Sequence, residues 1–353
     1  MRTLIAATLA LVTLPAMAEG VANRTIGYVL TNKSWAVYQT ADGKAECPQG
    51  FNDGPREQFK ALFPDDGKKR TLAETQLARE SDVWFPNSAE PANDKGPLPF
   101  KLASGKTALG LDLDGKIGPD DFTGPNGEPG IDNQMYRVLG CVPGFRGPEG
   151  ANFFFENDYM QRYIFNRVLI EITDVDDLVN DDDVTLTIYR GLDPLLASAN
   201  GKDFIPGGTQ RVDERWGKRY VTRMKGKIVD GVLTTEAADV KLPWTMTFDT
   251  NPDQQIKAAR FRLKLTATGA EGLLGGYVPV ANWGHHFQIN WSTHHASYGQ
   301  MATPSIIRKL HELADAYPDP ETGKNTAISG AAQMKFTQAY IVHSAPPKVA
   351  DAR

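Results

Sequence analysis

Two short stretches of this sequence carry many of its acidic side chains, and they are the first candidates for chemistry. The first acidic cluster, residues 112–132, contains six acids and a single base, Lys116. It also contains five Gly and three Pro, so we expect a kinked loop rather than a helix that would space the charges apart. The acids of this cluster are Asp112, Asp114, Asp120, Asp121, Glu128 and Asp132.

The second acidic cluster, residues 174–183, contains six Asp and no base. It lies between two stretches that are typical of β-strands, so a polar hairpin tip is the favoured explanation for its composition. Ion binding is the alternative, and it would use Asp174 and Asp176 as the first ligands.

A hard divalent cation would account for the crowded carboxylates of the first cluster. Ca²⁺ takes about 6–8 oxygen ligands, and Asp residues in a Gly-rich loop can converge on it. The EF-hand pattern does not fit, because a loop that starts at Asp112 has Lys116 at its fifth position and Thr123 at its twelfth. The alternative is a solvated acidic surface whose Asp and Asn cap turns. The candidate Ca²⁺ ligands are Asp112, Asp114, Asp120, Asp121, Asp132, Asp174 and Asp176.

All six His follow residue 280, and four of them lie in residues 285–295. If this segment is a strand, one of its faces is uniformly polar, and that face carries His286, Gln288, Asn290, Ser292 and His294. A straight strand would separate His286 from His294 by about 26 Å, so both can bind one Zn²⁺ or Cu²⁺ only if the chain reverses between them. Gln288 and Asn290 are then candidates for ligand contact. The alternative is an ordinary surface strand whose His are incidental.

Residues 1–18 have the features of a cleavable secretory signal. Arg2 precedes an uncharged apolar run, and the segment ends in Ala-Met-Ala at Ala18. We therefore expect a periplasmic or secreted protein. No later stretch is apolar for as long as a membrane helix requires, so no integral membrane segment is expected after cleavage.

Cys47 and Cys141 are the only cysteines, and export would place them where disulfides persist. Both lie in turn-like sequence beside Pro and Gly, and we expect one bridge that closes a loop of about 95 residues. A catalytic cysteine is the alternative, but it would need a reduced and activated thiolate.

The chain has 38 Lys and Arg against 43 Asp and Glu, and its formal net charge is −5. Nucleic acid is therefore not an expected partner. Short runs of β-type residues follow residue 166, and Asp230-Gly231 between two of them is a two-residue hairpin signal. One amphipathic helix is predicted from Thr303 to the residues before Pro318.

The short β-type runs after residue 166 follow one another without long intervening helices, which favours an antiparallel sandwich or barrel over a doubly wound sheet. We expect a mainly β protein with a β-sandwich-like core, a loop-rich N-terminal part and a few short helices. The expected divisions are a signal peptide (1–18), a disulfide-stapled region with the acidic ion-binding loop (19–150), and the β-sandwich with the C-terminal helix and His-rich segment (151–353).

Several familiar catalytic motifs are absent from the sequence, including His-Glu-x-x-His, Gly-x-Ser-x-Gly and the phosphate-binding P-loop. The favoured hypothesis is an exported, Ca²⁺-stabilised protein that binds a glycan or another envelope component. The alternative is a Zn²⁺- or Cu²⁺-dependent hydrolase or oxidoreductase that uses residues 285–295. The sequence identifies neither a particular ligand nor an oligomeric state.

Overall fold

The structure is a computed structural model, and strands dominate the part of the chain that it describes. The described residues are 24–52, 100–147, 150, 157–158, 160–162, 167–201, 203–244, 253–286 and 303–344. The expected signal peptide, residues 1–18, lies outside them. Among these residues, no helix combines the length and the apolar character that crossing a bilayer requires.

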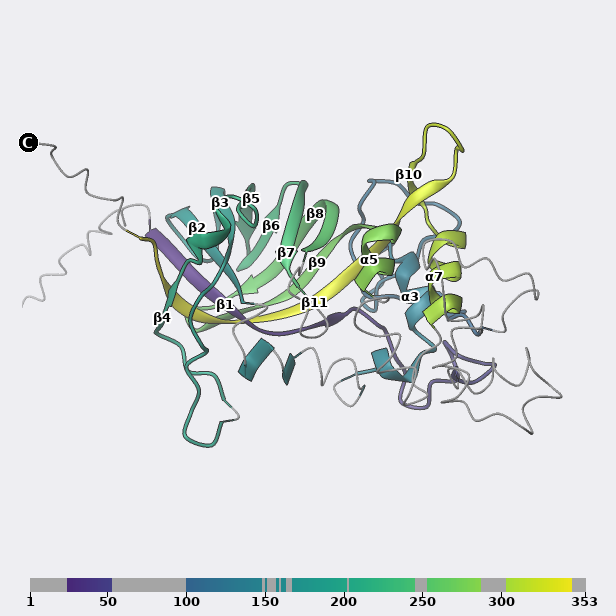
Figure 1. Cartoon of the computed structure of the whole chain (residues 1–353), viewed down its shortest axis with the longest axis horizontal. Helices are drawn as coiled ribbons and strands as arrows, with labels where there is room; N and C mark the ends of the chain where they lie inside the picture. Colours follow the sequence, from purple (N-terminus) through teal and green to yellow (C-terminus); the bar gives the residue numbers. More distant parts are fainter. Residues whose placement is uncertain are drawn as a thin grey trace, which may run out of the picture.

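Eight antiparallel strands form a closed barrel, with further strands added to it (Figure 1). Around the barrel the strands follow the order β1-β2-β3-β5-β6-β8-β9-β11, and β11 pairs again with β1. These strands are β1 (Arg24–Trp35), β2 (Val168–Val175), β3 (Asp181–Arg190), β5 (Thr222–Val229), β6 (Val232–Thr235), β8 (Asp253–Leu265), β9 (Gly269–Pro279) and β11 (Asn325–Val342).

The closed barrel corrects the expected β-sandwich. β1 forms a ladder on both of its edges, and Gly27 is opposite Glu171 of β2 on one side and Ala339 of β11 on the other. A sandwich and a barrel share the same alternation of inward and outward residues, so the alternation alone does not distinguish them. Residues on both sides of the expected boundary at residue 150 thus contribute to one sheet.

Short elements decorate the barrel, and three helices gather at one of its ends (Figure 1). β4 runs parallel to the end of β11, β7 pairs with β8, and β10 pairs with the start of β11. Their bounds are β4 (Gly208–Arg211), β7 (Ala238–Pro243), β10 (Ala316–Pro318), α3 (Gln134–Leu139), α5 (Val280–His286), α7 (Thr303–Glu312), and the 3₁₀ turns η2 (Pro143–Phe145) and η3 (Glu214–Trp216).

Large apolar side chains fill the interior of the barrel. In the middle of the barrel strands, the side chains that point inward are almost fully buried and alternate with outward ones, as the pleat of a strand requires. The inward side chains include Tyr28, Leu30, Ile170, Leu186, Ile188, Met224, Leu233, Phe261, Leu263, Leu274, Met334 and Phe336. The interior of the barrel is therefore a packed core, and space for a ligand lies on its outside or at its ends.

The hairpin predicted at Asp230-Gly231 is confirmed. These two residues connect β5 to β6 and have φ angles of 51° and 76°, the left-handed values that a two-residue hairpin favours. The predicted C-terminal helix begins at Thr303 as expected but ends at Glu312, and the chain then enters β10.

The His-rich segment does not begin as a strand. Val280 to His286 form α5, because Val280 and Trp283 are three residues apart and both are buried on one face of this helix. The Trp283 ring lies edge-on to Trp35, with ring centroids 5.3 Å apart, and Trp35 stacks on Trp244 at 5.0 Å. The alternation of two strand faces expected for residues 285–295 is therefore absent at His285 and His286, which belong to this helix.

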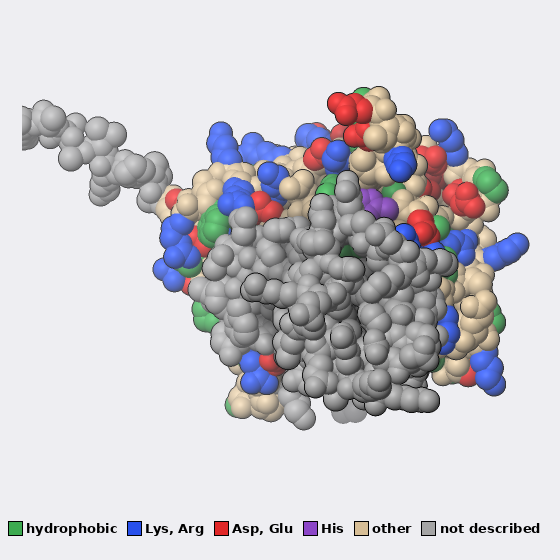
Figure 2. All heavy atoms as spheres, turned by 45° about the vertical axis from the view of Figure 1, so that its right-hand side comes forward, with side chains coloured by type: hydrophobic (Ala, Val, Ile, Leu, Met, Phe, Trp, Pro, Cys, Tyr) green, Lys and Arg blue, Asp and Glu red, His purple; other side chains and the backbone are tan. Residues whose placement is uncertain are grey.

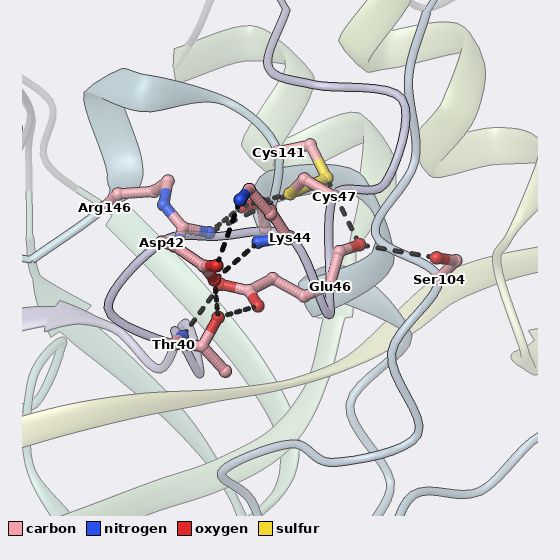
Figure 3. Close-up of polar contacts among 9 residues, drawn as sticks. Thr40, Asp42, Lys44, Glu46, Cys47, Ser104, Cys141 and Arg146 are labelled. Carbon is pink, nitrogen blue, oxygen red and sulfur yellow. Dashed lines mark hydrogen bonds and ion pairs between the residues drawn. A yellow bond between two sulfur atoms is a disulfide. The ribbon is translucent and has the colours of Figure 1, made fainter.

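The predicted disulfide between Cys47 and Cys141 is confirmed, and it lies beside a buried ion pair (Figure 3). Arg146 Nη2 is 2.6 Å from Glu46 Oε1, and Arg146 Nη1 donates to the carbonyl oxygen of Gly140. Burial opposes the ionisation of Glu46, but hydrogen bonds from Arg146 and Thr40 outweigh it and lower the pKa of this carboxyl. The bridge and the ion pair together hold the 40–52 loop against α3.

Replacing both cysteines, Cys47→Ala with Cys141→Ala, is expected to lower the free energy of unfolding by up to about 4–5 kcal/mol, because the bridge restricts a long loop in the unfolded chain. Urea denaturation measures this loss. Lys44→Ala is the control, since its side chain is 84% exposed on the same loop. An unchanged urea midpoint in the cysteine double variant would show that the bridge does not stabilise the fold.

Candidate metal site

Backbone pairing folds the first acidic cluster back on itself. Phe122 and Ile131 exchange two backbone hydrogen bonds of 2.9 Å, and the N–H of Asp132 donates to the carbonyl oxygen of Leu111 at 3.0 Å. This pairing brings the end of the acidic segment back beside its first residues. Asp132 consequently lies beside Asp112, although a long loop separates them in sequence.

The outer face of the barrel holds this acidic segment in place. Leu111 packs against Gly275 of β9, where a Cβ atom would lie only 3.0 Å from Leu111 Cδ1. Arg260 Nη1 of β8 donates to the carbonyl oxygen of Asp112 at 3.1 Å. Leu111 and Leu113 share a small apolar cluster with Ala36, Leu273 and Ala331.

Asp112, Asp114 and Asp132 bring carboxylate oxygens within 4.8 Å of one another. Each carboxylate also accepts a backbone N–H, which fixes its orientation: Gly115 donates to Asp112 at 2.7 Å, and Leu113 donates to Asp132 at 2.6 Å. Lys116 N–H donates to Asp114 at 2.9 Å. Among the described residues, no other group of three His, Cys, Asp or Glu comes as close together.

Two of these three carboxylates, those of Asp114 and Asp132, line a cleft of about 520 Å³, and Asp112 lies next to them. Asp120 and Asp121 line it too, and Asp121 Oδ2 accepts the N–H of Gly118 at 2.5 Å. The remaining lining residues include Gln134, Arg137, Tyr277, Glu312, Asp315 and Asn325. Figure 2 shows acidic side chains on the side of the molecule that carries β10 and α7 in Figure 1.

Asp315 also lines this cleft, although it was not among the residues predicted from the sequence. Asp315 lies just before β10, and both of its carboxylate oxygens accept hydrogen bonds from Ser329 of β11, from the backbone N–H at 2.7 Å and from the hydroxyl at 2.5 Å. No local pattern marks this residue, because it stands alone between two alanines. Only the pairing of β10 with β11 brings it to the site.

The electrostatics of the cleft penalise negative charge. Burial raises the pKa of Asp132 to about 6, and the charges of Asp121 and Asp114 contribute to this rise. Burial also raises the pKa of Asp315, with a contribution from Asp121. The pKa of the Tyr277 phenol is raised by burial and by the nearby Asp132 and Asp315. Protonation of these carboxyl groups, or the binding of a cation beside them, is therefore favoured.

The described residues that line the cleft include a single base, Arg137. Its guanidinium lies over the Phe122 ring, 4.3 Å from the ring centroid, and donates to the carbonyl oxygen of Ala103 at 3.3 Å. Burial lowers the pKa of Arg137. One base beside this many acids leaves the cleft with a net negative charge.

The second acidic cluster forms the connection between β2 and β3. Asp176 donates its backbone N–H to Asp181 Oδ2 at 2.7 Å, and Asp183 forms an exposed ion pair with Lys225 at 2.6 Å. Asp174 lies near the end of β2 and has a φ angle of 65°, at the point where the pairing of β2 with β1 shifts register. The structure does not bring Asp174 and Asp176 into a group of converging carboxylates.

The His-rich segment lies largely outside the described residues. His286 is the last residue of α5, and its side chain is not described. Gln288, Asn290 and His294 fall outside the described ranges altogether. The hypothesis of Zn²⁺ or Cu²⁺ at this segment therefore stays a prediction.

Comparison of the chain with protein-family models, with curated proteins and with solved structures finds no match.

Asp132→Asn is expected to stabilise the metal-free protein at pH 7 by about 1–2 kcal/mol, because the raised pKa of Asp132 makes its ionised form unfavourable in the fold. The contribution of the protonated carboxyl to stability is present at low pH and falls as the pH rises from about 4 to about 6. Urea denaturation in EDTA at pH 5 and pH 7.5 measures the difference between wild type and variant.

Asp176→Asn on the exposed β2–β3 connection is the matched control, and it is expected to change stability by no more than about 0.5 kcal/mol. A lower stability of Asp132→Asn at both pH values would contradict the burial argument.

Proposed function

We propose that the acidic cleft binds one Ca²⁺ ion and that this ion stabilises an exported ligand-binding protein. The observation that carries the proposal is the convergence of Asp112, Asp114 and Asp132 within 4.8 Å. Ca²⁺ binds oxygen at about 2.3–2.6 Å, so oxygens around one ion lie no more than about 5 Å apart. The spacing of these three carboxylates fits that limit.

The chemistry of the lining favours a hard cation. The cleft offers further carboxylate oxygens at Asp120 and Asp121 of the same acidic segment and at Asp315 before β10, and neither His nor Cys is among its described lining residues. Zn²⁺ and Cu²⁺ prefer nitrogen and sulfur ligands, whereas Ca²⁺ accepts 6 to 8 oxygens, about the number that carboxylates, carbonyls and water can supply together. We therefore propose Ca²⁺ rather than Zn²⁺ for this cleft.

A bound cation would reverse the unfavourable electrostatics of the cleft. In its absence, burial and mutual repulsion raise the pKa of Asp132 to about 6. An ion near Asp132 and Asp114 would hold both carboxylates ionised and would remove this cost.

The proposed location and ligand rest on the sequence and on the disulfide. A Cys47–Cys141 bridge persists in oxidising compartments, which agrees with the signal expected in residues 1–18. Modules outside the cytoplasm bind Ca²⁺ with dissociation constants of about 10⁻⁴–10⁻³ M, which calcium in such compartments can satisfy. The ligand that we propose is a glycan or another envelope component.

Calcium is expected to raise the melting temperature of EDTA-treated protein. At 10 mM Ca²⁺, roughly a 100-fold excess over a dissociation constant of 10⁻⁴ M, the gain is about 2.7 kcal/mol, or about 5 °C. Asp112→Asn with Asp114→Asn should abolish the shift, and Asp174→Asn with Asp176→Asn should preserve it. Equal shifts in the two double variants would place the responsible ion elsewhere.

Tb³⁺, an oxygen-preferring substitute for Ca²⁺, is expected to luminesce when light is absorbed by Tyr277, because this phenol lines the cleft. Tyr277→Phe should reduce the luminescence and leave the calcium-induced rise in melting temperature intact, whereas Asp132→Asn should abolish the luminescence. Strong luminescence in Asp132→Asn would show that Tb³⁺ binds outside the cleft.

A further inference from the structure

Two adjoining hollows of about 400 and 710 Å³ lie on the outer face of the barrel, over β8, β9 and β11. Lys264, Glu271 and Lys335 line both hollows, so the two form one groove with a charged row across its middle. The groove shares no lining residue with the acidic cleft. It is therefore a separate candidate site.

The charged row follows from the register of three neighbouring strands. Lys264 of β8 is opposite Glu271 of β9, and Glu271 is opposite Lys335 of β11. All three side chains are exposed, and within the described part of the chain none of them forms a side-chain hydrogen bond or ion pair. By contrast, Arg262, two residues from Lys264 on the same face, pairs with Glu128 at 3.1 Å.

The rest of the groove is rich in hydroxyl and amide groups. One end carries the half-buried Phe204 ring, and the other carries Leu109. In Figure 1 the loop before β4, which holds Phe204, and the segment that holds Leu109 lie toward opposite ends of β11. The polar lining residues are Asn32, Ser34, Thr266, Thr268, Gln333 and Thr337.

The barrel itself restricts what can bind here. β9 is paired on both edges, with β8 and β11, so the floor offers no free strand edge to an extended peptide. A ligand must therefore be recognised by side chains. The ammonium groups of Lys264 and Lys335 can bind carboxylates. The hydroxyl and amide groups of the groove, together with Glu271, can form hydrogen bonds with the hydroxyls of a sugar ring, and the Phe204 ring can pack on the apolar face of a sugar.

We propose that this groove binds an acidic oligosaccharide, a chain of hydroxyl-rich rings that carries carboxylates. Lys264 and Lys335 hold the carboxylates, Glu271 accepts hydrogen bonds from hydroxyls between them, and Phe204 stacks on a terminal ring. This inference rests on the proposed ligand-binding function but not on the calcium site. Net positive charge in the row, two bases against one acid, is complementary to such a ligand.

Calorimetric titration in calcium-free buffer tests the proposal with two probes, hyaluronan tetrasaccharide, which carries carboxylates, and neutral maltotetraose. Only hyaluronan tetrasaccharide is expected to bind. Lys264→Met with Lys335→Met should weaken binding about tenfold or more, because charge-assisted hydrogen bonds are lost. Phe204→Ala should weaken it as well, whereas Phe204→Trp should preserve it.

Lys227→Met is the matched control, since Lys227 is an exposed outward residue of β5 that does not line the groove. Asp132→Asn should leave binding unchanged, so a failure of the calcium proposal and a failure of the groove are distinguished. Equal binding of both probes, no binding of hyaluronan tetrasaccharide, or an unchanged affinity in the double lysine variant would overturn the proposal.

Discussion

β1 pairs with β2 on one edge and with β11 on the other, and these two ladders close the barrel. They join residues near the start of the described chain to residues near its end, for example Gly27 to Ala339. Each barrel strand is then paired on both edges, and alternate side chains are directed into a single core. Loops and helices must pack on the outside of the barrel or at its ends, and both candidate sites are found in those places.

β11 also holds the two halves of the acidic cleft together. The Ser329 hydroxyl donates to the Asp315 carboxylate and accepts the backbone N–H of Gln134, two residues after Asp132. Because Ser329 is fully buried, these hydrogen bonds are shielded from water. Burial, with a smaller contribution from the neighbouring charges of Asp121 and Asp114, raises the pKa of Asp132 in this arrangement. Because the fold holds these like charges close together, a bound cation would reduce their repulsion.

Local patterns predicted the local features of this protein. Turn chemistry at Asp230-Gly231 gave the correct hairpin, and the two cysteines gave the correct bridge. Closure of the barrel was not predictable in this way, because it depends on pairing between residues about 300 positions apart. The entropic cost of closing so long a loop depends on its length and not on a local pattern of residues. The same holds for Asp315, which reaches the cleft only through β10 and β11. At α5, burial of Trp283 outweighed the apparent strand alternation of the His-rich segment.

The central claim is that Asp112, Asp114 and Asp132 share one cation. An anomalous difference map from a crystal grown with excess Ca²⁺ would locate this cation. We expect a single peak among these three side chains, about 2.3–2.6 Å from their oxygens. An empty cleft in that map, with well-ordered carboxylates turned away from one another, would contradict it.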